Sequence, residues 1–217
     1  MSDAVHSSHT AAAAAIIKPV EPGFGVKNGK AAMWLFLASD AMSFGGLLCA
    51  YAMLRGSHPQ WPEPGTILGL TTTAIMTFIL ICSSVTMVLA LNACHQNDLA
   101  GFRKWLGLTV LGGASFLAGQ AYEYNHLIRH VMSMPKGVYA LHWTGPFGAT
   151  FFGTTGFHGM HVLGGVIYLS VIWWKGRNGK YLGAKFLPVE LVGLYWHFVD
   201  LVWILVFTFI YLLPVRA

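Results

Sequence analysis

Three ionisable residues, Glu190, His197 and Asp200, lie in the last apolar segment of the chain. That segment is long and apolar enough to span a bilayer as a helix. On a helix that turns about 100° per residue, the three side chains fall within a sector of roughly 80°. A charge exposed at the centre of a bilayer costs roughly 2.5 to 3.5 kcal/mol even on the mild insertion scale. We therefore expect this face to meet other helices of the same chain or of a partner subunit.

His197 and Asp200 are one helical turn apart, a spacing at which two side chains of a helix can pair. Asp40, toward the middle of the first apolar span, is expected to face protein in the same way. It adjoins a stripe of small residues that would let another helix approach closely: Ser39, Ser43, Gly46 and Ala50. For all three polar residues, both a structural or lipid-contacting role and a role in proton movement or ligand binding remain open.

Two histidines, His158 and His161, share one face of the fourth span with Thr154 and Gly165. Histidines at this spacing can ligate a metal or, together with His197, approach a haem. A transmembrane di-haem cytochrome needs histidine pairs on facing helices at two depths, and the other three apolar spans contain no histidine. The pattern therefore favours partnership with buried carboxylates or with a lipid headgroup. Glu123 is a further candidate polar residue, at the outer end of the third span.

The composition is that of a polytopic membrane protein. Of the 217 residues, 55% are hydrophobic and 10% are charged, and the mean hydropathy is +0.59. Soluble domains carry about 25% charged residues. The net charge of +5 lies almost wholly outside the apolar segments, which indicates topology signals and anionic headgroups rather than nucleic acid. The three cysteines form no CxxC pair, so neither a disulfide framework nor a thiolate metal site is indicated.

The hydropathy pattern predicts an all-α bundle with five transmembrane helices. Backbone groups in hydrocarbon must be satisfied within their own segment, so each apolar span is expected to be a helix. The predicted helices cover about residues 31–54, 66–91, 104–123, 149–174 and 190–213 of a membrane domain at 31–217. Residues 1–30 lack the cationic start and apolar core of a secretory signal, and we expect them to form a mobile cytoplasmic tail.

The distribution of basic residues predicts the orientation. Alternate flanks of the five spans hold nine Lys and Arg residues on one side and four on the other. The nine are Lys18, Lys27, Lys30, Arg103, Lys104, Lys175, Arg177, Lys180 and Lys185, and the four are Arg55, Arg129, Lys136 and Arg216. The positive-inside rule then places the N-terminus in the cytoplasm and the C-terminus outside.

Three segments resemble subunit III of the haem–copper oxidases in the same order along the chain. They are WLFLASD at 34–40, FFGTTGFHGMHV at 151–162 and GLYWHFVDLVW at 193–203, the last preceded by Glu190. The resemblance covers about residues 31–213 and includes, less specifically, the patch at 120–124 that holds Glu123. It departs from the family at Asp40, where the family usually has Glu.

The resemblance implies an accessory, non-redox subunit of a proton-pumping terminal oxidase in the bacterial cytoplasmic membrane. Such a subunit packs on subunit I, contains ordered phospholipid and helps to sustain proton uptake and turnover. No cofactor is expected in this chain, whereas haem and copper are expected in its partners. Subunits I and II, a small subunit IV and a respiratory supercomplex are the partners that the resemblance implies. Mitochondrial relatives have seven helices, and this chain begins at the equivalent of the third.

Several alternatives remain open. The same family includes quinol-oxidase subunits and a companion protein of nitric oxide reductase. A proton-coupled transporter could use Asp40, His197 and Asp200 as a relay, but the sequence shows neither the inverted repeat nor the interrupted helices typical of that class. A b-type cytochrome is the third alternative, and an absorption spectrum of the isolated chain would distinguish it.

Overall fold

The structure is a computed structural model, which describes residues 28–58, 61, 69–132 and 145–213. The chain forms two units, Met1–Ala32 and Met33–Ala217. In the first unit only residues 28–32 are described, and they are helical, although we expected residues 28–30 to belong to the tail. The rest of the predicted tail lies outside the described residues.

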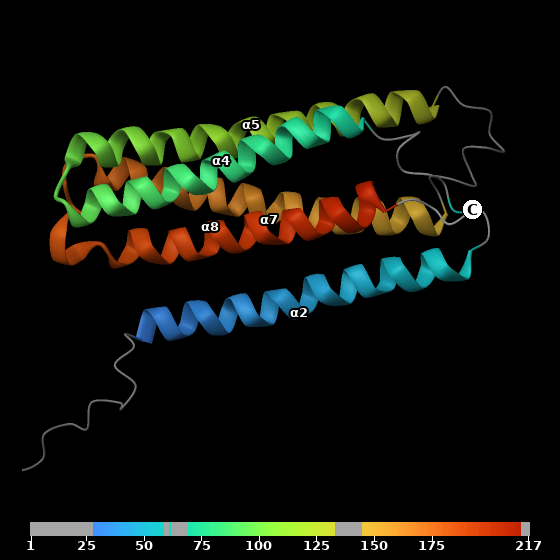
Figure 1. Ribbon diagram of the computed structural model, residues 1–217, viewed down its shortest axis with the longest axis horizontal. Coiled ribbons are helices and arrows are strands. Elements are labelled where there is room, and N and C mark those ends of the chain that lie inside the picture. The colour runs from blue at the N-terminus through green and yellow to red at the C-terminus, as the bar shows by residue number, and fades with distance from the viewer. Residues whose placement is uncertain (1–27, 59–60, 62–68, 133–144, 214–217) are drawn as a thin grey trace, which may run out of the picture. The chain divides into compact units, whose positions relative to one another are not determined.

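Five long helices account for almost all of the described chain (Figure 1). They are α2 (Asn28–Ser57), α4 (Leu70–His95), α5 (Leu99–Met132), α7 (Pro146–Gly176) and α8 (Leu187–Val206). A short 3₁₀ turn, η1 (Gly183–Lys185), precedes α8, and a π-helical segment, η2 (Phe207–Leu212), continues it. The described residues contain no strand, and the all-α prediction is confirmed.

Four of the described helices are long and apolar enough to cross a membrane: α2, α4, α7 and the combined segment Leu187–Leu212. The third helix, α5, is 34 residues long but less apolar. Glycines and polar residues interrupt its apolar stretch, and basic residues occupy its beginning. The finding therefore supports a membrane protein with at least these four candidate spans, one fewer than we predicted.

Most helices extend beyond the bounds expected from hydropathy, whereas α4 (Leu70–His95) is shifted along the chain relative to the predicted 66–91. The clearest case is α5, which begins at Leu99 and continues to Met132 rather than covering 104–123. Hydropathy marks the part of a helix that suits hydrocarbon, whereas the backbone hydrogen bonds continue through polar residues that reach the headgroups or water. The connection between the third and fourth helices is correspondingly shorter than the sequence suggested.

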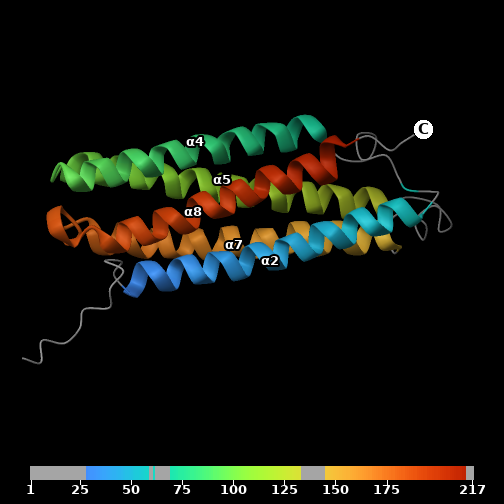
Figure 2. The ribbon, with the colours of Figure 1, turned by 60° about the horizontal axis from the view of Figure 1, so that its bottom comes forward.

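Four helices pack in a closed ring, in which α4 contacts α5, α5 contacts α7, α7 contacts α8, and α8 contacts α4 (Figures 1 and 2). The indole of Trp196 fills the centre of this ring and is fully buried. Two glycines make room for it: a Cβ on Gly113 of α5 would lie 2.5 Å from the indole, and one on Gly165 of α7 would lie 2.9 Å from it. The close packing of α5, α7 and α8 therefore depends on the absence of side chains at these positions.

Residues 33–57 of α2 lie beside α7 and α8, outside the ring (Figure 2). Their contacts with the ring are made by long side chains, such as Phe44, whose ring centroid is 4.9 Å from that of Phe157. The small-residue stripe at Ser39, Ser43, Gly46 and Ala50 is exposed. Within the described chain, no helix uses the close approach that this stripe allows.

Candidate functional site

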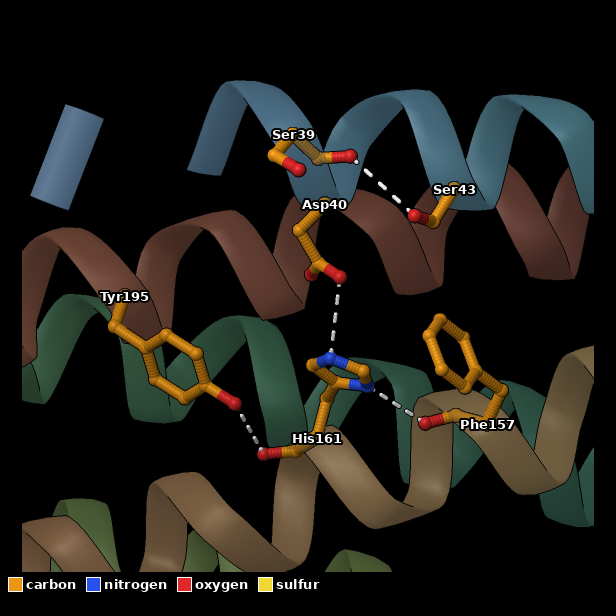
Figure 3. Close-up of polar contacts among 6 residues, drawn as sticks. All are labelled: Ser39, Asp40, Ser43, Phe157, His161 and Tyr195. Carbon is orange, nitrogen blue, oxygen red and sulfur yellow. Dashed lines mark hydrogen bonds and ion pairs between the residues drawn. The ribbon is translucent and has the colours of Figure 1, made fainter. Parts of the chain in front are cut away.

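A polar site that contains an acid and a base joins α2 to α7 (Figure 3). The carboxyl oxygen Oδ1 of Asp40 lies 3.2 Å from Nε2 of His161. The other ring nitrogen of His161, Nδ1, lies 2.8 Å from the backbone carbonyl oxygen of Phe157, one turn earlier on α7. From α8, the hydroxyl of Tyr195 donates a hydrogen bond to the carbonyl oxygen of His161 at 2.9 Å. Three helices therefore meet at one imidazole.

Aromatic rings shield this pair from the surroundings. The ring of Phe44 lies edge-on to the imidazole of His161, with 5.3 Å between centroids. The side chains of His161 and Asp40 are 16% and 9% exposed. Because hydrocarbon solvates charge poorly, an acid and a base held together here are stabilised mainly by each other. Breaking the contact between Asp40 and His161 is therefore expected to destabilise the packing of α2 against α7.

His158 lies one turn before His161 and deeper in the bundle, where it is fully buried. Its imidazole stacks on the indole of Trp203 at a centroid distance of 4.9 Å and meets the edge of Phe116 at 5.8 Å. Neither ring nitrogen has a hydrogen-bond partner among the described residues. In this structure His158 packs as an aromatic ring between α5, α7 and α8.

His197 and Asp200 meet α4 rather than forming a direct ion pair with each other within the described chain. The hydroxyl of Ser84 on α4 lies 3.3 Å from Nδ1 of His197 and also lies beside the carboxyl group of Asp200. Asp200 is 7% exposed and His197 is partly buried. Both side chains turn toward the same neighbouring helix, so a hydroxyl from that helix connects them. Glu190, in the first turn of α8, is partly buried as well.

Glu123 is buried near the C-terminal end of α5. The hydroxyl of Thr73 on α4 donates to its carboxyl oxygen Oε1 at 3.0 Å. One turn further along α4, the hydroxyl of Thr77 accepts a hydrogen bond from the indole of Trp203 at 2.9 Å. A polar layer therefore ties α4 to α5 and α8.

The hydroxyl partners Thr73, Thr77 and Ser84 were not assigned to particular contacts by sequence reasoning. The abundance of Ser and Thr in the second apolar span predicts polar packing between helices. It does not identify the partners, because the register between two helices is set by tertiary packing.

An apolar groove of about 410 Å³ lies between α2 and α8. It is lined by Trp34, Leu37, Ala38, Ala41, Leu194, His197, Phe198 and Leu201. Apart from the indole N–H of Trp34, only His197 offers a polar side-chain group. A groove of this size and lining suits a hydrocarbon chain better than a polar substrate.

Within the described residues, no three His, Cys, Asp or Glu side chains gather in a way that could hold a metal ion. Asp40, His161, Glu123 and His197 make polar contacts across helices, whereas His158 packs between aromatic rings. Together these features define the protein as an all-α membrane protein whose buried polar residues connect helices to one another.

Comparison with known proteins assigns the family. The sequence pattern of the family described as "Cytochrome c oxidase subunit III" matches residues 18–215. The chain is 43% identical over 180 residues to cytochrome c oxidase subunit 3 of Thermostichus vulcanus, covering 82% of this chain and 84% of the relative. A relative with the same name from Corynebacterium diphtheriae is 39% identical over 180 residues, with the same coverage of both chains. Another from Synechocystis sp. is 41% identical over 181 residues, covering 82% of this chain and 73% of the relative.

The chain therefore belongs to the cytochrome c oxidase subunit III family, and the resemblance seen in the sequence is confirmed. Members of this family are accessory subunits of haem–copper oxidases, the complexes that reduce oxygen. Within the segments that carried the resemblance, Asp40, His158, His161, His197 and Asp200 all lie at helix contacts of this fold.

Proposed function

We propose that this chain braces the redox subunits of a proton-pumping cytochrome c oxidase and holds phospholipid beside them. The observation that carries this proposal is the use of the family's polar residues: they connect α2, α4, α7 and α8 instead of converging on one reactive centre. A chain built in this way supplies a shaped, rigid surface. The chemistry of oxygen reduction, which needs a preorganised set of metal ligands, then belongs to the haem- and copper-bearing partners.

The proposed partners are oxidase subunits I and II, with a small subunit IV as a further candidate, and the assembly as a whole could join a respiratory supercomplex. Large apolar side chains are exposed on several helices, including Phe36 and Met42 on α2, Phe78 on α4 and Met160 on α7. Such surfaces suit either lipid or a partner's transmembrane helices. The names of the relatives favour cytochrome c over quinol as the electron donor of the complex.

The groove between α2 and α8 is the proposed phospholipid site. Its apolar lining matches an acyl chain, and the partly buried imidazole of His197 is its polar element. Lipid held there would fill space between two helices whose side chains line the groove. The lipid would thus act as part of the packed structure.

We further propose that all five helices cross the bacterial cytoplasmic membrane, with the N-terminus inside and the C-terminus in the periplasm. The nine-to-four distribution of basic residues supports this orientation. The span at α5 is supported by its length of 34 residues and by its packing between α4 and α7, which themselves qualify as membrane spans.

Purification through a tag on this chain tests the assignment. Mild detergent extraction is expected to yield a complex with the absorption spectrum of haem and with cytochrome c oxidase activity. Dissociation of the tagged chain should then leave all haem and copper with the other subunits. Stoichiometric haem or copper in the isolated chain would overturn the non-redox role, and a tagged complex that oxidises quinol but not cytochrome c would overturn the choice of donor.

A further inference from the structure

The imidazole of His161 touches a hydrogen-bond acceptor at each of its nitrogens (Figure 3). Nδ1 faces the carbonyl oxygen of Phe157 at 2.8 Å, and a carbonyl oxygen only accepts hydrogen bonds. Nε2 faces a carboxyl oxygen of Asp40 at 3.2 Å. A neutral imidazole carries only one N–H, and an ionised carboxylate carries none. With the common protonation states at neutral pH, one of the two contacts would therefore bring two lone pairs together.

Changing the tautomer does not remove the conflict. A proton on Nδ1 satisfies Phe157 and leaves the bare Nε2 facing the carboxylate of Asp40. A proton on Nε2 satisfies Asp40 and leaves the bare Nδ1 facing the carbonyl oxygen at 2.8 Å. Both contacts are satisfied together only when the pair carries one more proton than an ionised carboxylate beside a neutral imidazole.

We propose that Asp40 and His161 together bind one shared proton, and that this proton completes the attachment of α2 to α7. The proton resides either on the carboxyl group, which then donates to Nε2, or on Nε2, which then donates to the carboxylate. Both arrangements have zero net charge, whereas the pair without this proton has a net charge of minus one. The neutral arrangement is the one that a shielded position beside hydrocarbon favours.

The other ionisable groups around the pair leave the proton in place. Tyr195, the nearest such group on α8, uses its hydroxyl to donate to the carbonyl oxygen of His161. His158 lies on α7 beside His161 and is itself buried without a polar partner. In the described chain, Asp40 forms its ion pair with His161 and with no Lys or Arg. No fixed positive charge therefore compensates the carboxylate once the proton leaves.

Loss of the proton is expected to loosen α2. The remaining contacts of residues 33–57 include the ring contacts of Phe44 and the hydrogen bond from the side chain of Arg55 to the backbone carbonyl oxygen of Leu213. The attachment should be complete at lower pH, where the proton is bound, and should weaken as the pH rises and the proton leaves.

Infrared difference spectroscopy on the full chain in lipid nanodiscs tests the proton itself. Raising the pH from mildly acidic to alkaline should remove either a protonated-carboxyl band or an imidazolium band, and the wild-type chain should release one proton more than Asp40→Asn does. An imidazolium band should shift when histidine is labelled with nitrogen-15, a carboxyl band should shift when aspartate is labelled with carbon-13, and either band should vanish in Asp40→Asn. A wild-type spectrum that shows ionised Asp40 beside singly protonated His161 already at acidic pH would overturn the proposal.

A distance measurement tests the attachment. Spin labels at the native Cys49 on α2 and at Met160→Cys on α7, with Cys82 and Cys94 replaced by Ser and Ala, report on the separation of the two helices. The distance distribution should broaden at alkaline pH. In Asp40→Asn it should stay narrow at every pH, because the amide N–H donates to Nε2 without a titrating proton. Ser43→Ala, a change at an exposed position on α2, should behave like wild type.

Two results of the distance measurement would contradict the role in attachment. One is an identical distribution at all pH values in the wild-type chain. The other is a broadening with pH that persists unchanged in Asp40→Asn. The infrared measurement needs only the wild-type chain, so it still decides the question of the proton if a variant does not fold.

Discussion

At the scale of single residues, the bundle depends on positions where a side chain is missing. Gly113 accommodates the indole of Trp196, and a Cβ there would lie only 2.5 Å from it. Gly113→Ala is therefore expected to destabilise the chain by about 1 to 3 kcal/mol, as overpacking of a tight core does. Gly153→Ala is the matched control, since its Cβ would meet nothing within 4 Å. Thermal unfolding of the two variants in the same detergent compares them, and equal transition temperatures would contradict this account of the packing.

The buried carboxyl group of Glu123 depends on a hydroxyl from another helix. Thr73→Val keeps the shape of the side chain but removes the donor that lies 3.0 Å from Oε1. Leaving one buried partner unsatisfied costs about 1 to 3 kcal/mol, so the thermal transition should fall. Thr72→Val, at the exposed neighbouring position on α4, is expected to leave it unchanged. Equal stability of both variants would show that Glu123 does not need Thr73.

The sequence predicted which residues are buried better than it predicted their partners. Asp40, His158 and Asp200 are buried, as expected from the cost of exposing them to lipid. His197 and Asp200 interact electrostatically, as their spacing suggested, but the hydroxyl of Ser84 that lies beside both was not predicted. Spacing along one helix fixes which side chains share a face. It does not specify which residue of another helix lies opposite.

At the scale of helices, hydropathy located all five elements but misplaced several of their ends. The bounds of α5 differ most, because its polar ends remain helical outside the apolar stretch. The same polar content keeps α5 below the hydropathy of the other four helices. A helix that packs on two others can be less apolar than one that faces lipid all round, since part of its surface meets protein.

If α5 crosses the membrane, as proposed, its two ends lie on opposite sides, with the N-terminal end inside. The native Cys94, near the end of α4, is buried and is a poor target for labelling. Gln96→Cys and Asn125→Cys occupy exposed positions before and late in α5. An impermeant thiol reagent applied to intact cells should label Asn125→Cys only, and should reach Gln96→Cys only in inverted vesicles. Labelling of both from one side would contradict the fifth span.

If the groove between α2 and α8 holds a phospholipid, a bulky side chain placed in the groove should displace that lipid. Ala41→Trp places a large side chain in the groove of about 410 Å³ and is expected to displace one bound phospholipid per chain. Ala50→Trp, an exposed position on α2 outside the groove, should retain it. Mass spectrometry of lipids that copurify with each complex gives the comparison. Equal lipid content in the two variants would place the lipid elsewhere.

At the scale of the whole molecule, the fold is a helix bundle that holds most of its ionisable intramembrane residues at helix contacts and offers apolar surfaces to its surroundings. Its polar contacts join α2, α4, α5, α7 and α8 to one another. Membership of the oxidase family assigns this bundle to a complex that reduces oxygen. The central claim is that the chain sustains that complex while its partners carry the redox centres.

The most direct test of this claim compares the oxidase before and after removal of this chain. The haem absorption spectrum and the initial rate with reduced cytochrome c should remain nearly the same, because the metal ligands belong to the partner subunits. Turnover should decay faster during sustained catalysis, and adding the chain back with phospholipid should restore the longer lifetime. Equal turnover lifetimes with and without the chain, or loss of the haem spectrum on its removal, would contradict the account.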